Sequence, residues 1–177
     1  MNKGKVVLGI AAGLFAIYVV AAPYITVHQM KSAAKSHDGE ALSEHVEFPS
    51  VRQSLKDQMN AMFAKKMAED DNMKNNPFAA FGTALSGMMV DKMVDAYVTP
   101  AGITHLMVGE KPRPLAEQGE EATSSTARKP LSGATMSYES LDKFVVKVKG
   151  NDGGEGKFVF RRRGFGWKLT DIIIPLQ

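Results

Sequence analysis

Residues 6–27 read VVLGIAAGLFAIYVVAAPYITV and contain no charged side chain. At about 1.5 Å of rise per residue, a helix of this length would reach roughly 33 Å, which is enough to cross the hydrocarbon core of a bilayer. Lys3 and Lys5 precede the stretch. Tyr18 and Tyr24 lie in its second half, where an aromatic ring with a polar tip favours the membrane interface. The stretch therefore predicts an N-terminal transmembrane helix that attaches the chain to a membrane through residues 6–27.

A cleaved signal peptide is the alternative interpretation of the same residues. The basic start, the apolar run and the small residues Ala21 and Ala22 all fit it. Pro23 argues against a cut after Ala22, because the peptidase needs an extended chain without proline at that position. A cut after Ala21 remains open. Apolar character continues through Ile25 and Val27, which favours an uncleaved anchor.

Gly9 and Gly13 form a GxxxG pair within the apolar stretch. Two such helices can approach each other closely through small residues. Small residues are also common in apolar segments generally, so the pair predicts no more than a weak self-association.

The residues after the apolar stretch carry helical patterns. Asp38 can cap a helix after a turn, and Pro49 suits the first turn of the next helix. Apolar residues then recur with a period near 3.6 on either side of Pro77, and Thr99 with Pro100 ends one helix and begins another. Glu40, Glu44 and Glu47 are spaced along one side of a short helix, and we expect a solvated face there.

The C-terminal part carries strand patterns instead. Two segments alternate apolar and polar residues, and a third is a strand pattern that ends at a proline. A fourth, shorter strand is expected over residues 135–139. The three are SLDKFVVKVKG (140–150), GKFVFRRR (156–163) and GWKLTDIIIP (166–175). The fold class predicted is α+β, with an N-terminal transmembrane helix followed by several helices packed on a small antiparallel sheet of three to four strands.

Four parts are expected along the chain. Residues 109–133 are rich in Pro, Glu, Ser and Thr, cannot bury enough apolar surface to offset the entropy of ordering, and predict a flexible linker. The other parts are a membrane anchor or signal peptide (1–27), a helical part (28–108) and a β part (134–177) that packs on the helices to form one domain.

The basic residues of the β part are the first candidate binding site. Alternation places Arg162 on one face of its strand and Arg161 and Arg163 on the other. An anion or lipid headgroup contact is therefore conceivable on one exposed face, although charges at a hairpin end can also simply keep a sheet edge soluble. Nucleic acid is not expected as a partner. The members of this face are Lys147, Lys149, Arg161, Arg163 and Lys168.

An apolar pocket is the second candidate site. Two apolar helices packed over one face of a curved sheet can leave a cavity between the layers. Such a pocket would suit a lipid or another hydrophobic small molecule. Its expected lining is Phe78, Phe81, Leu85, Met89, Phe160 and Trp167.

Residues with catalytic spacing are not found. The chain has no cysteine, and it lacks a nucleophile elbow, a phosphate loop, an HExxH sequence and a dinucleotide fingerprint. The four histidines are scattered, and the methionine pairs lie on stripes that a core needs. We predict neither an enzyme nor a bound cofactor or metal.

Several segments resemble a bacterial family of unknown function, DUF2939. The most specific are AAPY (21–24), EFPSVR (47–52), VTPAG (98–102) and WKLTDIIIP (167–175). The resemblance implies a bacterial protein with an N-terminal membrane segment and an α+β body. It implies no activity and no catalytic residues.

Taken together, these features predict a single-pass protein of the bacterial inner membrane whose body faces the periplasm. We expect a non-enzymatic binding or accessory module of the cell envelope, with an envelope protein as its partner. The alternative is a carrier or sensor of a lipid or hydrophobic small molecule, and an enzyme of unrecognised type comes third. If the N-terminal segment is cleaved, the body would be secreted to the periplasm.

Overall fold

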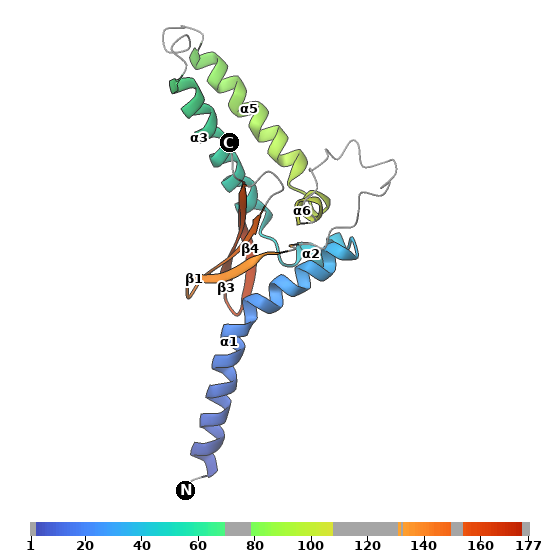
Figure 1. Ribbon diagram of the computed structural model, residues 1–177, viewed down its shortest axis with the longest axis vertical. Coiled ribbons are helices and arrows are strands. Elements are labelled where there is room, and N and C mark those ends of the chain that lie inside the picture. Colours follow the sequence, from blue (N-terminus) through green and yellow to red (C-terminus); the bar gives the residue numbers. More distant parts are fainter. Residues whose placement is uncertain (1–2, 70–78, 108–130, 132, 150–153, 175–177) are drawn as a thin grey trace.

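The computed structural model describes residues 3–69, 79–107, 131, 133–149 and 154–174. Most of the expected linker lies outside these residues. The helices are α1 (Lys3–Lys35), α2 (Gly39–Ser43), α3 (Phe48–Glu69), α5 (Ala79–Tyr97) and α6 (Pro100–Met107). The strands are β1 (Thr135–Ser140), β2 (Lys143–Lys149), β3 (Glu155–Arg163) and β4 (Gly166–Ile173), so the expected α+β class is confirmed (Figure 1).

The four strands form one antiparallel sheet in the order β1-β2-β3-β4. The segment between α2 and α3 pairs with the outer edge of β4. There the Leu169 N–H donates to the His45 carbonyl at 2.8 Å, and the Glu47 N–H donates to the Leu169 carbonyl at 2.9 Å. This short pairing covers an edge that would otherwise expose unpaired backbone groups.

The register divides the side chains of the sheet into two faces. Phe144 lies opposite Phe160, which in turn lies opposite Leu169, and all three are buried in the main core. Val145 lies opposite Val159 on the other face; both are buried but lie outside that core. Their neighbours on this face are mainly lysines and arginines, whose aliphatic stems can cover apolar surface while the charges stay in water.

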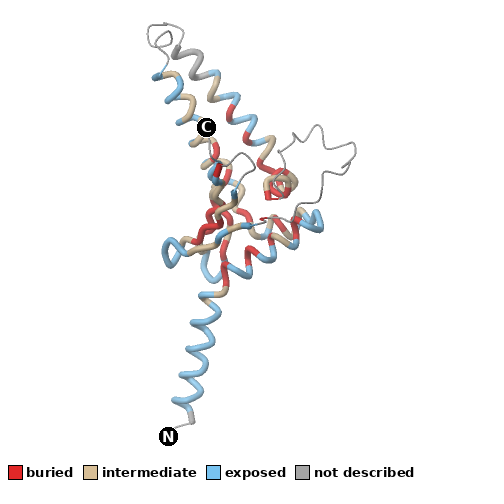
Figure 2. The backbone as a smooth tube through the Cα atoms, in the orientation of Figure 1, coloured by how far each residue is buried: buried red, intermediate tan, exposed pale blue. Residues whose placement is uncertain are grey.

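Helix α1 divides into two parts of different burial (Figure 2). Residues 4–20, called here the exposed half of α1, are apolar and exposed almost throughout. Residues 21–35, called the packed half, bury one side against the body. The buried positions of the packed half are Ala22, Pro23, Thr26, Val27, Met30, Ala33 and Ala34.

The packed half of α1 and helix α3 both contact β4, and they supply the helical layer over the inner face of the sheet. Two helices over one face of the sheet were expected from sequence, but the helix that carries Leu85 and Met89 is not one of them. Helix α5 packs instead against α3, and the two form an arm that extends away from the exposed half of α1 (Figure 1).

Polar contacts fasten this arm and its base. Lys56 of α3 reaches Asp95 of α5 at 3.2 Å, and Arg52 donates to the Val98 carbonyl at 3.1 Å. Gly102 in α6 approaches the chain so closely that a Cβ there would overlap the Tyr97 carbonyl oxygen. Only glycine fits this turn between α5 and α6.

Candidate functional site

The four described members of the predicted apolar pocket do not lie together. Phe78 and the side chain of Phe81 lie outside the described residues. Leu85 and Met89 are exposed on α5, whereas Phe160 and Trp167 are buried in the core of the sheet. The apolar stripe of α5 that is buried contains Val90 and Val94, so the expected lining is divided between an exposed helix face and a filled core.

The predicted basic residues do share one face of the sheet. Lys147 lies opposite Lys157, and Arg161 lies opposite both Lys143 and Lys168, all on the face that carries Val145 and Val159. They extend along its whole length, however. In the register of the strands, Lys149 lies opposite Glu155 at one end of this face, and Arg163 lies opposite Gly166 at the other end. They are therefore a long basic face and not a single anion site.

Carboxylates accompany several of these cations. Lys147 lies 3.5 Å from Glu155, and Arg161 lies 3.7 Å from Asp142. Lys143, which belongs to the same face, lies 2.7 Å from Glu139. These are half-exposed surface pairs, which contribute little to stability individually but reduce the net charge of the face.

Arg163 makes a contact of two hydrogen bonds with Glu47. Its Nε donates to one carboxylate oxygen at 3.0 Å and its Nη2 donates to the other at 2.7 Å. The hydrogen bonds from Arg163 and Ser50 lower the pKa of Glu47 from its ordinary 4.5 to about 2. The pair joins the end of β3 to the beginning of α3. Glu47 was expected on a solvated face, and nothing local in the sequence indicates a partner 116 residues away.

An aromatic cluster lies where the packed half of α1 meets the sheet. The rings of Tyr24 and Phe144 are 4.8 Å apart, those of Tyr138 and Phe144 are 5.1 Å apart, and both contacts are edge to face. Trp167 approaches Tyr138 at 5.8 Å. The Tyr138 hydroxyl donates to the Val20 carbonyl at 2.9 Å, and burial raises the pKa of this phenol. The cluster fixes the sheet to the place where α1 leaves the body.

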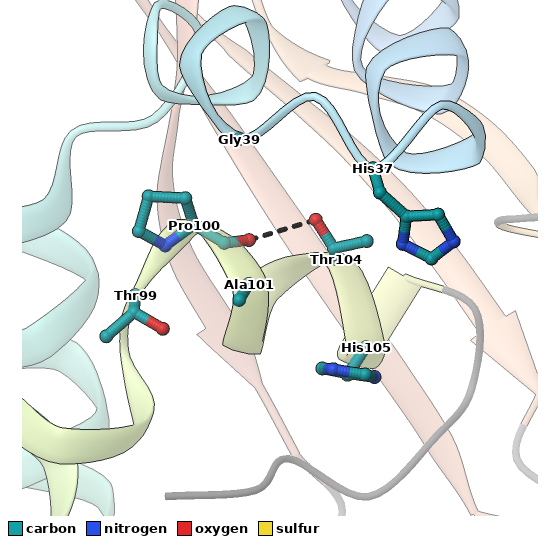
Figure 3. A pocket seen from close by; sticks show the side chains of 7 residues that line it. All are labelled: His37, Gly39, Thr99, Pro100, Ala101, Thr104 and His105. Carbon is teal, nitrogen blue, oxygen red and sulfur yellow. Dashed lines mark hydrogen bonds between the residues drawn. The ribbon is translucent and has the colours of Figure 1, made fainter. Parts of the chain in front are cut away.

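A small open cavity of about 320 Å³ lies between the turn after α1 and helix α6 (Figure 3). Its polar lining includes His37, His105 and two threonines. Thr104 donates to the Pro100 carbonyl at 2.9 Å, and Thr99 accepts from the Gly102 N–H at 3.1 Å. The two hydroxyls thus form hydrogen bonds with backbone groups of α6.

The sequence predicts no metal site and a weak self-association through Gly9 and Gly13. Among the described residues, no group of three or more His, Asp or Glu side chains could hold a metal ion. Gly9 and Gly13 lie on the exposed half of α1, and a Cβ at either position would meet no other atom within 4 Å. Their surface is open to a second helix, and self-association stays a prediction.

Comparison with known proteins supports one assignment. A family model described as a protein of unknown function (DUF2939) matches residues 12–106. The match runs from the exposed half of α1 to the last turn of α6 and ends before the sheet. No curated protein and no solved structure matches the chain. Because the family model covers more than half of its residues, the protein belongs to the DUF2939 family.

Proposed function

We propose that this protein is a single-pass membrane protein whose α+β body acts as a non-enzymatic binding or accessory module of the cell envelope. The observation that carries the proposal is the continuity of α1, which joins an exposed apolar half to a half that is part of the core. In this arrangement the anchor continues into the core of the body as one helix, without an intervening loop.

The exposed half of α1 needs an apolar environment. Leu8 and Ile17 are 72% and 66% exposed, and apolar side chains surround the helix on all sides. Monomeric soluble proteins rarely expose apolar patches of more than a few hundred Å², because water disfavours them. A bilayer removes this cost, and residues 4–20 lie at the lower limit of the length that spans it.

The packed half of α1 favours an uncleaved anchor over a signal peptide. Ala22 and Pro23 are buried, and the Tyr138 hydroxyl binds the Val20 carbonyl. A cut after Ala21 would place a new charged amino terminus beside this buried junction and remove the Val20 acceptor. The cost of burying such a charge supports a chain that stays whole.

The arm formed by α3 and α5 supports a binding role. It extends from the body at the end opposite the exposed half of α1 (Figure 1). On α5 the side chains of Leu85, Met88, Met89 and Met93 are exposed at helical spacing, opposite the buried Val90 and Val94. Flexible methionine side chains adapt to the shape of a partner. We place the contact with an envelope protein on this surface.

The ionic contacts of the body support a non-enzymatic role. Arg163 with Glu47 joins the sheet to α3, and Lys56 with Asp95 joins α3 to α5. These charged groups stabilise the packing of the sheet on α3 and of α3 on α5.

Compartment and anchorage can be tested together in one fusion protein. A reporter active only in the periplasm is fused after Gln177, and the N-terminal mass of the protein from carbonate-washed membranes is measured. The proposal expects reporter activity and a mass that includes residues 1–20. A shortened protein in the soluble fraction would contradict it.

Partner binding needs a separate test. A photo-crosslinking amino acid at Met89 is expected to capture the same membrane protein in repeated experiments in living cells. The same amino acid at Ala64, exposed on α3, is the matched control. Equal capture at both positions, or none at Met89, would contradict a partner surface on α5.

A further inference from the structure

The two hairpin turns of the sheet each present one exposed apolar side chain. Leu141, between β1 and β2, is 89% exposed, and Phe165, between β3 and β4, is 72% exposed. Single exposed apolar residues are common on protein surfaces. Here, however, both turns lie at one end of the sheet, since the Arg162 N–H donates to the Asp142 carbonyl at 2.9 Å. Residues 139–143 and 161–168 are called here the hairpin end.

The hairpin end adjoins the point at which α1 leaves the body. Tyr138, at the end of β1, donates its hydroxyl hydrogen to the Val20 carbonyl, the last residue of the exposed half of α1. Tyr24, one turn further on, packs its ring against Phe144 of β2. Figure 1 shows both turns level with the bend of α1, and Figure 2 shows that the turns and the exposed half are accessible together.

The hairpin end is also cationic. Its cations are Lys143, Arg161, Arg162, Arg163 and Lys168. Glu139 and Asp142 are its carboxylates, and Glu47, the residue before α3, forms an ion pair with Arg163. The hairpin end therefore carries five cations against three carboxylates, and this excess of positive charge lies next to the two apolar tips.

We infer that the hairpin end is a second membrane contact, in which Leu141 and Phe165 enter the bilayer that holds α1. Apolar tips at this level reach the boundary between headgroups and acyl chains, where their burial is favourable. The surrounding arginines and lysines then lie at the level of the phosphates, and anionic lipids attract them. The inference rests on the proposed anchorage, because α1 brings the tips to the surface.

This contact gives the body one orientation on the membrane. A single spanning helix can tilt in the bilayer and turn about its own axis, and the body moves with it. The helix together with two separate tips defines a plane. The arm of α3 and α5 then points away from the lipid (Figure 1). The same contact accounts for the sequence RRRGFGW: a turn with phenylalanine at its tip, arginines at the headgroups, and Trp167 buried behind them.

The test uses spin labels in the full-length protein, which contains no native cysteine. Single cysteines replace Leu141, Phe165, Met88 or Leu14, and each labelled protein is reconstituted into vesicles of phosphatidylcholine with phosphatidylglycerol. Collisions with oxygen, which is concentrated in lipid, and with a water-soluble nickel complex report depth. The labels at residues 141 and 165 are expected to lie roughly 5–10 Å inside the headgroup boundary, with nickel collisions several-fold fewer than at residue 88.

Each control position separates one failure from another. If residues 141 and 165 collide with nickel as often as residue 88 while residue 14 is shielded, the hairpin contact is wrong and the anchor stands. If residue 14 is itself accessible to nickel, the proposed anchorage fails as well. All labelled proteins should show the same thermal unfolding, because the labelled sites are exposed.

Two further variations test the chemistry of the contact. Phe165→Ser should raise nickel collisions at a label on residue 141, since the two tips enter together, whereas Met88→Ser should leave them unchanged. Vesicles of phosphatidylcholine alone should also give a shallower position at residue 141. An unchanged depth in both vesicles would contradict the role of the cations, and an unchanged depth in Phe165→Ser would contradict cooperation between the tips.

Discussion

The two halves of α1 are both rich in apolar residues and belong to one helix, but they have opposite burial. In the exposed half, apolar side chains occupy every side, and consecutive residues such as Val6, Val7 and Leu8 are exposed. In the packed half, Val27 and Met30 are buried, whereas His28, Gln29 and Ser32 are exposed. The apolar content of a helix shows that it avoids water. The period of its apolar residues shows whether lipid surrounds it or protein covers one side of it.

The largest expected effect comes from charge in the exposed half. Ile10→Arg combined with Leu14→Arg should disfavour membrane insertion by about 5–7 kcal/mol, because each arginine near the centre of a spanning helix costs about 2.5–3.5 kcal/mol. Fractionation should show the protein leaving the membrane, with the unfolding temperature of the body unchanged. Ser32→Arg, in the packed half, is the control and should alter neither. A body that unfolds at lower temperature in the double variant would show that the exposed half supports the fold.

A cavity in the packed half should have the opposite consequence. Met30→Ala removes a fully buried side chain and should lower the free energy of unfolding by about 2–5 kcal/mol. Leu14→Ala, the matched change in the exposed half, should leave the unfolding of the body unchanged. Denaturant titration followed by circular dichroism measures both. An equal loss of unfolding free energy in both variants would contradict this difference, because it would mean that Leu14 and Met30 lie in the same environment.

Pro23 lies near the boundary between the halves, and replacing it should change the bend of α1. A proline inside a helix removes one backbone hydrogen bond and bends the axis. Figures 1 and 2 show α1 bending where the exposed half meets the packed half. A straight helix would separate the Cα atoms of residues 11 and 32 by about 32 Å. Spin labels at these positions should give a shorter distance in the native sequence, and Pro23→Ala should lengthen it. An unchanged distance would assign the bend to the packing of Tyr24.

Acid should produce the smallest effect, and only in the body. The folded state lowers the pKa of Glu47 to about 2, so its contact with Arg163 stabilises the fold fully above pH 4.5 and progressively less between pH 4.5 and 2. Glu47→Gln should therefore lower the unfolding temperature at neutral pH and match the native protein near pH 2. Glu69→Gln, at the exposed end of α3, is the control. Membrane attachment through the exposed half should persist across this range.

Much of the secondary structure could be predicted from local patterns. The uncharged run indicates α1, alternation interrupted by Val145 and Val159 indicates β2 and β3, and the cap at Asp38 is present, with its carboxylate accepting from the Ala41 N–H at 3.0 Å. The same alternation correctly places Arg161 and Arg163 on one face of the sheet and Arg162 on the other. These features depend on neighbours in sequence, so the sequence contains them.

The partners of each surface could not be predicted in the same way. The stripe of α5 is apolar on a face that packs against α3 and on another that is exposed, and periodicity does not say which element covers which face. That is why the predicted pocket joined Met89 to Phe160. The contact between Glu47 and Arg163 and that between Val20 and Tyr138 join residues more than 100 positions apart, and only the tertiary fold brings them together.

The most direct test of the central claim is the period of lipid exposure along α1. Single labelled cysteines from residue 6 to residue 35, in the full-length protein in vesicles, would each be scored for collisions with oxygen and with a water-soluble nickel complex. The account predicts oxygen access without a helical period through residue 20, followed by a period near 3.6 in nickel access from residue 21 onward. A period near 3.6 that begins at residue 6, or nickel access throughout the first half, would contradict it.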